Sequence, residues 1–535
     1  MFKYIKYAIL VYVLTYLNHT AEAQLQPERY FNNTGGLIDR YSPVLVPAKN
    51  ASDIQNIQFD TRGKLLKRNG FDLNNSTSVT TGGTAYMSTR AVAGLGYHQS
   101  TTGTSFLGIV VGTNVFTSGN SYGGTFTNVT GTITITTGQT NQAQFTSFRD
   151  YGIMCTNSDP PIRILNASAF RIVGASTGAK TCESFNNYLL LGHTSEDAVI
   201  YGSRLRWSDL NSITSWPANN YIDIEPDDGD SITAIKRYQN TLYVFKKRSI
   251  HEVIITGNSG ADAFIVRPVA RGIGAYAKNS VVPIETRGIV FLGADGIYLF
   301  DGSNFEFISD PIQTKINNLN RSRYPYAVGA LYPAKHQLWL AVSAGSETSN
   351  DTILVWDYIQ EAWSVYDGIT ANALTTVEDS NGNILLFSGD NTGNLYKQDT
   401  GTSDEPAGVT TAISSFYTTP DLTIGMPETD KSFKYLYVFT SITNTTNITV
   451  DVSYNYAAGF QDSHLLSVGQ TGAAWGTATW GTSLWPSAGT NISRITLDRR
   501  AKSVRIKFSD NSATNLGILG WTLVYTPEDY RVDSH

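Results

Sequence analysis

The sequence predicts an all-β protein: a β-propeller of six to eight blades, with seven favoured, followed by an antiparallel β-sandwich of jelly-roll type. Three observations predict this fold. After residue 30, short runs rich in Val, Ile, Tyr, Phe and Thr alternate with clusters of Gly, Asn, Asp and Ser, a pattern typical of strands and turns. One apolar motif recurs at the spacing of a propeller blade. That recurrence stops near residue 400, although strand-like alternation continues beyond it.

The recurring motif is a short apolar run that follows a turn. Its copies lie about 46 residues apart on average, which is the length of a four-stranded propeller blade. We expect each copy to be one strand of one blade, and the alternative is a sandwich with evenly spaced strands. The seven copies are anchored at Leu107, Ile153, Leu189, Leu242, Ile289, Leu338 and Ile384.

The texture of the chain divides it into four segments. Residues 1–23 form a signal-like hydrophobic leader, and residues 24–90 form an amino-terminal arm that also closes the propeller. Residues 91–404 are expected to be the propeller and residues 405–535 the sandwich. A polar linker is expected at residues 399–408, and the best helical candidate is a short segment at residues 311–319.

The amino-terminal leader has the composition of an export signal. Lys3 and Lys6 precede an apolar run over residues 7–17, and an Ala-x-Ala sequence ends at Ala23, as at signal-peptide cleavage sites. The run is too short for an ordinary membrane-spanning helix. We therefore expect no stable membrane span. The alternatives are an over-extended start or a leader that is never processed.

The composition excludes a disordered chain and a general nucleic-acid coat. Of the 535 residues 16% are charged and 41% are hydrophobic, including 12% aromatics, whereas a typical soluble chain carries about 25% charged residues. This is ample material for cores. The net charge of −6 argues against a protein that covers nucleic acid through a basic surface.

No constellation of residues indicates an enzyme, and we predict no catalytic, cofactor-binding or metal-binding residues. Cys155 and Cys182 are the only cysteines and are expected to be isolated buried thiols; the seven histidines show no ligand spacing. The segment from Ser208 to Trp216 only loosely resembles the Asp-box turn of sialidase propellers. An acidic stretch could bind calcium through its carboxylates, but a solvated loop is favoured. It contains Asp223, Glu225, Asp227, Asp228 and Asp230.

Three tryptophans share one Gly/Thr-rich segment of the carboxyl-terminal region, at Trp475, Trp480 and Trp485. Exposed indoles are unfavourable on a soluble monomer, and buried tryptophans often dominate the energy of interfaces. We predict that this segment makes contacts between subunits or with another protein. The alternative is a loop folded over the end of the sandwich.

Several short stretches, in this order along the chain, resemble a family of structural proteins from tailed-bacteriophage virions. The first runs from Gly35 to Phe71 and includes Gly-Gly-Leu at its start and Arg62-Gly63-Lys64-Leu65-Leu66-Lys67-Arg68-Asn69-Gly70-Phe71 at its end. The other stretches span residues 204–209, 293–302 with 309–312, 357–363 and 520–527. The resemblance implies a β-propeller in the neck or tail, of the nozzle, stopper or tail-hub type, and it carries over no catalytic residues.

The leading functional hypothesis is therefore a virion component that forms part of a ring or conduit through which DNA passes. Its expected partners are further copies of itself in a cyclic ring, neighbouring portal, adaptor or tail proteins, and double-stranded DNA in transit through the lumen. A mildly acidic surface would not retain phosphate. The alternative, favoured by the leader alone, is a secreted adhesin or glycan-binding protein. A propeller glycoside hydrolase is a third hypothesis. No cofactor is expected.

Overall fold

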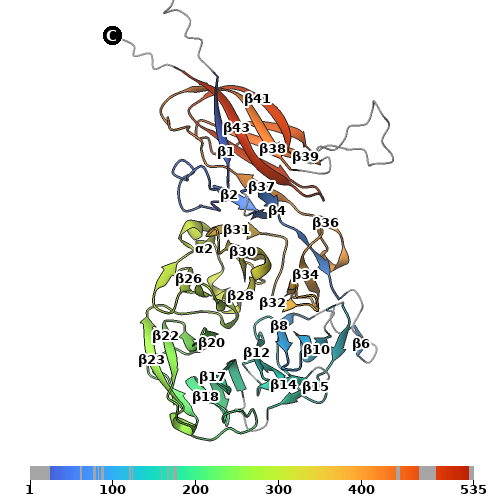
Figure 1. Ribbon diagram of the computed structural model, residues 1–535, viewed down its shortest axis with the longest axis vertical. Helices are drawn as coiled ribbons and strands as arrows, with labels where there is room; N and C mark the ends of the chain where they lie inside the picture. The colour runs from blue at the N-terminus through green and yellow to red at the C-terminus, as the bar shows by residue number, and fades with distance from the viewer. Residues whose placement is uncertain are drawn as a thin grey trace, which may run out of the picture.

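The computed structural model consists of a ring of β-sheets with a second group of sheets attached at its rim (Figure 1). The structure describes residues 25–528 except 61–62, 76–79, 82–83, 86–89, 120–121, 123, 158, 166–167, 173–177, 442–445 and 469–489. The leader at residues 1–23 and the segment with Trp475, Trp480 and Trp485 lie outside the described residues. Predictions about them therefore stay predictions.

Within the described residues the ring contains seven sheets, numbered here as blades 1 to 7, whose strands follow one another along the chain. Blade 1 consists of β8 (Val92–Gln99), β9 (Ser105–Val111), β10 (Asn114–Ser118) and β11 (Phe126–Asn128), and blade 2 consists of β12 (Gln144–Phe148), β13 (Tyr151–Cys155), β14 (Ile162–Leu165) and β15 (Ser168–Arg171). Blade 3 consists of β16 (Gly178–Phe185), β17 (Tyr188–Glu196), β18 (Val199–Trp207) and β19 (Tyr221–Asp223), and blade 4 consists of β20 (Ile232–Tyr238), β21 (Thr241–Lys246), β22 (Ser249–Ile255) and β23 (Phe264–Arg271). Blades 5 to 7 are β24 (Val282–Ile284), β25 (Gly288–Leu292), β26 (Ile297–Phe300), β27 (Phe305–Phe307); β28 (Val328–Tyr332), β29 (Gln337–Val342), β30 (Thr352–Asp357), β31 (Ala362–Tyr366); and β32 (Ala373–Glu378), β33 (Ile384–Gly389), β34 (Leu395–Thr400) with β5 (Gly70–Leu73).

The prediction of an all-β chain containing a propeller is confirmed. The first strand of each blade contacts the first strand of the next, and β32 returns to β8, so these innermost strands close a circle. Each of the seven predicted anchors lies in the second strand of a different blade. The apolar motif recurs because a second strand is covered on both faces by neighbouring blades; every residue of β9 and β25, for example, is buried.

The ring is closed by a strand from the amino-terminal arm. Strand β5 pairs antiparallel with β34 and supplies the fourth strand of blade 7. The polar linker expected at residues 399–408 differs from what the structure contains. Instead of leaving the sheet, this segment continues it through β35 (Ser403–Asp404), which pairs with β5 and with β36 (Thr411–Ala412). A polar composition here reflects a solvated sheet edge.

The carboxyl-terminal region forms two antiparallel sheets, and the arm contributes strands to both. One sheet has the order β3-β4-β43-β38-β41 with β1 added to β43, and the other has the order β2-β37-β42-β39-β40. Their strands are β1 (Gln26–Phe31), β2 (Asp53–Gln55), β3 (Ile57–Phe59), β4 (Leu65–Lys67), β37 (Ser415–Thr418), β38 (Lys431–Thr440), β39 (Thr446–Tyr454), β40 (Asp462–Val468), β41 (Asn491–Ala501), β42 (Val504–Asp510) and β43 (Gly517–Pro527).

Trp521 lies at the centre of the contact between these two sheets. Its indole is fully buried, and the ring centroids of Phe508 and Tyr417 from the opposite sheet lie 5.1 Å and 6.0 Å from it. The same hydrophobic cluster continues into blades 5 and 6 of the propeller. The ring and the terminal sheets therefore share one core rather than meeting across a solvated linker.

Helical structure is sparse in the part of the chain that the structure describes. The α-helix α2 (Gln313–Asn317) lies inside the segment predicted to be helical, and none of the described helices is long and apolar enough to cross a membrane. A small hairpin, β6 (Thr80–Thr81) with β7 (Thr84–Ala85), separates β5 from blade 1. The short 3-10 helices are Gly260–Asp262, Lys278–Ser280, Asp310–Ile312, Arg321–Tyr326, Pro333–Lys335 and Pro406–Gly408.

Candidate functional site: the central channel of the propeller

The Asp-box-like segment at Ser208 is a structural turn. The Ser208 hydroxyl is fully buried and accepts a hydrogen bond from the Leu189 amide at 3.0 Å. The Trp216 indole donates to the Ile213 carbonyl at 2.7 Å. These contacts fix the connection between β18 and β19, and they leave the Ser208 hydroxyl pointing into the blade instead of toward a substrate.

Most of the acidic stretch is neutralised by basic side chains from neighbouring strands. Asp223 forms a bidentate pair with Arg204, with N···O distances of 2.8 Å and 2.9 Å. Asp228 accepts from Lys246 at 2.8 Å. In the described part of the chain, no group of three or more His, Cys, Asp or Glu side chains is arranged to hold a metal ion. Calcium binding at this loop therefore has no geometric support.

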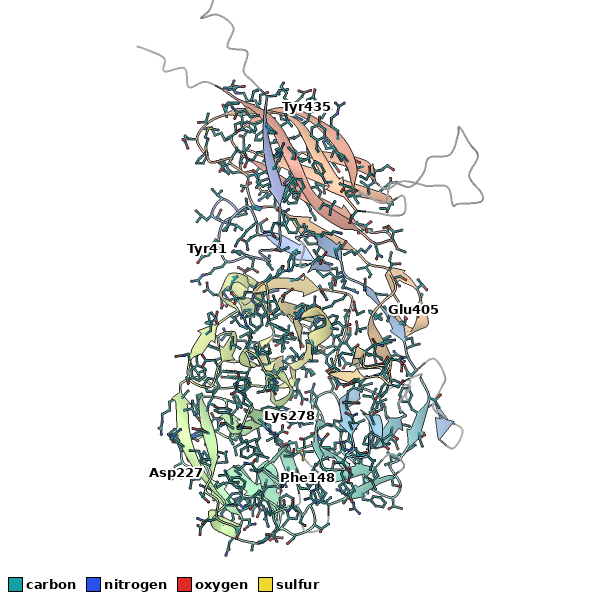
Figure 2. The ribbon with its side chains drawn as sticks, viewed as in Figure 1. Tyr41, Phe148, Asp227, Lys278, Glu405 and Tyr435 are labelled. Atoms are coloured by element: carbon teal, nitrogen blue, oxygen red, sulfur yellow. The ribbon has the colours of Figure 1, made fainter. Side chains whose placement is uncertain are left out.

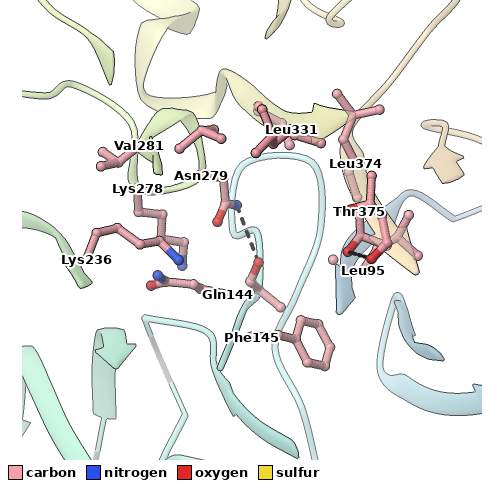
Figure 3. Close-up of a pocket in the computed structure, with 18 of the residues that line it drawn as sticks. Leu95, Gln144, Phe145, Lys236, Lys278, Asn279, Val281, Leu331, Leu374 and Thr375 are labelled. Carbon is pink, nitrogen blue, oxygen red and sulfur yellow. Dashed lines mark hydrogen bonds between the residues drawn. The ribbon is translucent and has the colours of Figure 1, made fainter. Parts of the chain in front are cut away.

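A concave feature of the described structure is the channel along the axis of the ring, lined by the innermost strands (Figure 3). A cavity of about 210 Å³ inside it is bounded by residues of β8, β12, β20, β24, β28 and β32. A second cavity, of about 240 Å³, lies among segments that precede β12, β24 and β28, together with Lys180 near the start of β16. Because inner strands begin there, this second cavity is a mouth of the channel.

Lys278 lines both cavities and lies toward the centre of the ring, whereas Asp227 lies at the periphery (Figure 2). Lys278 is only 7% exposed. The Lys278 ammonium donates to the backbone carbonyl of Lys180 at 3.0 Å. No ion pair with a carboxylate is recorded for Lys278 or Lys180 among the described residues. Burial lowers the pKa of each lysine to about 8, and the charge of Lys247 acts in the same direction on Lys180, as the charge of Lys180 does on Lys278. Both are still charged at neutral pH.

His193 adds a third basic group to the mouth. It occupies the bulge where the register of β17 against β18 shifts, and its backbone is left-handed with φ of 55°. Burial and the charges of Lys180 and Lys278 lower the pKa of His193 to about 4, so the imidazole is neutral at pH 7. Its Nδ1 atom is buried without a hydrogen-bond partner among the described residues.

Gln144 lies on β12 inside the channel. Only 3% of the residue is exposed, and neither the nitrogen nor the oxygen of its carboxamide has a hydrogen-bond partner in the described structure. Figure 3 shows this amide beside the ends of Lys278 and Lys236. Lys236 differs from Lys278 because Glu183 lies 3.5 Å from its ammonium. A buried amide with both polar atoms unpaired is energetically costly, which indicates a place for a polar ligand or water.

Two thiols lie behind Lys278. Cys155 and Cys182 are free and fully buried. As expected, they are not joined in a disulfide. Both belong to one hydrophobic cluster, because β13 and β16 lie in adjacent blades, and burial together with the neighbouring Cys155 thiol raises the pKa of Cys182. The Cys182 thiol is therefore neutral at pH 7.

Sequence reasoning missed Lys180, Lys278, His193 and Gln144. Each is a common polar residue in a segment without a motif. Lys278 and Gln144 are buried and Lys180 and His193 are half-buried, and what distinguishes them is the lack of an opposing charge or of a hydrogen-bond partner among the described residues. The only sequence signal is a lysine close to an innermost strand, seen at Lys180 and Lys278, and this signal requires the blade assignment to be recognised.

A second polar cluster lies where the arm passes between the ring and the terminal sheets. The Arg68 guanidinium is 2% exposed and forms a bidentate pair with Asp404 at 2.6 Å and 2.8 Å. It also donates to the Asn56 side chain at 2.8 Å. The adjacent Lys67 is 3% exposed and points to the terminal sheets, where its ammonium lies 2.8 Å from the Asp510 carboxylate. Consecutive residues of the arm thus pair with carboxylates on opposite sides of the junction.

Two glycines let the arm approach this junction closely. A Cβ atom at Gly70 would lie 1.8 Å from the Ser403 carbonyl oxygen. Gly36 has φ of +77°, and a Cβ atom there would lie 2.6 Å from the Trp363 amide nitrogen. Any larger side chain would separate the arm from the blades. The Gly-Gly-Leu and Arg-x-Gly elements of the first stretch therefore have packing roles.

No family model and no curated protein matches this sequence. Among solved structures, the chain is similar to the WD40 domain of Pan2 from Neurospora crassa, with 11% identity, a TM-score of 0.36, and coverage of 58% of this chain and 91% of that one. It is also similar to BamB from Moraxella catarrhalis, with 12% identity, a TM-score of 0.35, and coverage of 71% and 98%. The computationally designed protein Ika8 aligns at 12% identity with a TM-score of 0.25 over 65% of this chain and 83% of that one. These TM-scores are low, and the propeller is evident from the strand order of the chain itself.

Proposed function

We propose that this protein is a structural component of a bacteriophage neck or tail, in which propellers with appended jelly-roll-like sandwich domains assemble into a ring. The observation that carries this proposal is the place of the stretches that resemble the virion family. They are far apart in the sequence, yet four of the five contribute side chains to one hydrophobic cluster. These side chains include Leu37, Leu65, Ile297, Ile312, Tyr358, Trp363 and Trp521.

Backbone contacts join the same stretches directly. The Leu37 amide donates to the Trp363 carbonyl at 2.9 Å, and the Asp39 amide donates to the Pro311 carbonyl at 2.9 Å. The indole of Trp363 donates to the Ile308 carbonyl at 2.8 Å. Motifs that meet at a domain junction favour a role in holding a shape, because catalytic motifs are expected to converge on a cleft.

A shared core also suits a ring whose subunits must resist deformation. Domains joined by a solvated linker move relative to each other by default, whereas here Arg68, Lys67 and one continuous cluster tie the terminal sheets to the blades. Such a subunit keeps its shape when neighbours bind on either side. The buried charge pairs add directional contacts that a purely apolar junction lacks.

The test is to purify virus particles from a host that carries this gene and to quantify the protein by mass spectrometry. We expect a fixed copy number per particle, in the ratio of a cyclic neck or tail component, and a polypeptide that begins after about residue 20 or at an internal start. Purified residues 24–535 should form closed rings alone or with adjacent neck proteins, as measured by native mass spectrometry. Absence from particles would contradict the proposal.

The alternative is a secreted adhesin or glycan-binding protein, which the leader alone favours. It predicts a monomer in the culture medium that begins at Gln24 and binds a glycan array. A propeller hydrolase would in addition show turnover that one Asp or Glu substitution abolishes. Either result, together with absence from particles, would replace the virion assignment.

A further inference from the structure

We propose that the propeller channel contains a binding site for a small oxyanion, a phosphate or carboxylate group, at the point where its two cavities meet. The site is formed by Lys278, with Lys180 on the side of the mouth and Gln144 on the side of the channel interior. This inference does not depend on the virion assignment, because it rests on the charge and hydrogen bonding of the channel alone.

The first step is the charge balance of the site. Ammonium groups this deeply buried normally have a carboxylate partner, yet the recorded partner of the Lys278 ammonium is a backbone carbonyl. The nearest acidic influence on Lys180 is Asp230, whose carboxylate already accepts from the Arg248 and Ser231 amides at 2.9 Å and 2.7 Å. Two neighbouring positive charges without a counter-ion make an anion site.

Other charges around the mouth act in the same direction. Lys247 lies with its ammonium 5.9 Å from the ring centre of Tyr276, which lines the mouth cavity, and its charge contributes to the lowered pKa of Lys180. His193 and Cys182 lie near the same lysines and are neutral at pH 7. The positive potential at the mouth is therefore not cancelled by the groups packed around it.

The second, independent observation is Gln144. Its carboxamide is more than nine-tenths buried and unpaired at both polar atoms among the described residues, and it lies beside the end of Lys278 (Figure 3). The neighbouring Asn279, by contrast, donates to the Ala143 carbonyl and the Gln142 amide oxygen, both at 3.3 Å. An oxyanion would accept from the Gln144 amide and from Lys278 at once, and charged acceptors form the stronger hydrogen bonds.

The size of the cavities sets the class of ligand. Volumes of about 210 Å³ and 240 Å³ accommodate a phosphate ion or a small carboxylic acid. Duplex DNA does not fit, because its major groove alone is about 12 Å wide. The channel of a single propeller therefore accommodates a small ligand and not a duplex.

The experiment is isothermal titration calorimetry of the full chain with inorganic phosphate in one arm and citrate in the other, at pH 7. We expect saturable binding of at least one probe, and which of them binds identifies phosphate or carboxylate as the preferred group. Lys278→Met and Lys180→Met should each weaken binding about tenfold or more, and Gln144→Leu about threefold, by the loss of a charged or neutral donor. Lys180→Arg should retain binding, because it keeps the charge.

The matched control is Lys502→Met, which removes an exposed lysine from the terminal sheets and should leave affinity unchanged. Equal affinity in the wild type, Lys180→Met and Lys278→Met would overturn the site, as would no heat of binding with either probe at millimolar concentration. Unchanged affinity in Gln144→Leu would contradict the part assigned to this amide. If Lys278→Met does not fold, Lys180→Met and its arginine counterpart still decide the outcome.

Discussion

Two regions of this molecule each contain a pair of largely enclosed basic residues, and the charge is balanced at one of them but not at the other. At the junction, Arg68 and Lys67 each meet a carboxylate within 2.8 Å. In the channel, Lys278 and Lys180 meet no carboxylate within the described structure, and their pKa values fall to about 8. Paired charges fix geometry, whereas unpaired charges leave an unsatisfied demand that a ligand can meet. The presence of counter-ions at the junction and their absence in the described channel distinguish a structural site from the proposed binding site.

The largest effect is expected from breaking the junction. Arg68→Met leaves the buried Asp404 carboxylate without its bidentate partner, and removing one member of a buried pair costs about 3–5 kcal/mol. The free energy of unfolding, measured by urea denaturation, should fall by that amount. Arg267→Met, which breaks an exposed pair with Glu252, should cost less than about 1 kcal/mol.

The double variant Arg68→Met/Asp404→Leu sharpens this test. It removes both charges, so it should recover a large part of the loss seen in Arg68→Met, since the penalty comes from an uncompensated buried charge. A loss in Arg68→Met no greater than in Arg267→Met would show that the junction does not depend on this pair.

The channel should respond to pH in a way that the junction does not. Unfolded lysine keeps its proton up to about pH 10.5, whereas folded Lys278 loses it near pH 8. Between these values the unfolded state binds more protons, so the free energy of unfolding attributable to Lys278 rises with pH. At about 1.36 kcal/mol per pKa unit, the wild type should gain about 3 kcal/mol relative to Lys278→Met over this window.

Urea denaturation of both proteins at intervals from pH 7 to 10.5, in buffer free of phosphate and carboxylate, measures this difference. Lys502→Met serves as the control and should follow the wild type, because Lys502 is exposed. A constant difference between wild type and Lys278→Met would contradict the account of Lys278 as a buried, unpaired cation.

A smaller loss of stability should separate the cost of a close contact at the junction from the cost of a left-handed backbone conformation alone. Gly36→Ala places a methyl group 2.6 Å from the Trp363 amide at a φ of +77°, and it should cost about 2 kcal/mol. Gly425 has a similar φ of +73° with nothing within 4 Å of its would-be Cβ, so Gly425→Ala should cost about 1 kcal/mol. Thermal unfolding of the two variants measures the difference between their losses of stability. Equal losses would mean that the arm moves away from Trp363 at no further cost in stability.

These contrasts also mark where sequence reasoning reached its limit. The second strand of each blade was predictable because an apolar run between turns is a local pattern, and Leu107, Ile289 and Leu338 all lie in such runs. The pairing of β5 with β34 joins residues more than 300 positions apart, and no local pattern specifies it. A buried pair such as Arg68 and Asp404 is equally non-local. The unpaired state of Lys278 could not be predicted for a further reason, because it depends on the absence of carboxylates around this residue in the described structure.

The smallest expected effect concerns the coupling of the two channel lysines. The charge of Lys180 lowers the pKa of Lys278, although burial is the larger cause and the neighbouring Cys155 and Cys182 act in the opposite direction. In a Lys180→Met background this repulsion is absent, so the pKa of Lys278 should move above 8 while remaining below 10.5. The pH-dependent difference in unfolding free energy between Lys180→Met and Lys180→Met/Lys278→Met should then begin at a higher pH and be smaller than in the wild-type background. An identical pH profile in both backgrounds would mean that the two ammonium groups do not sense each other, and that a single anion does not bridge them.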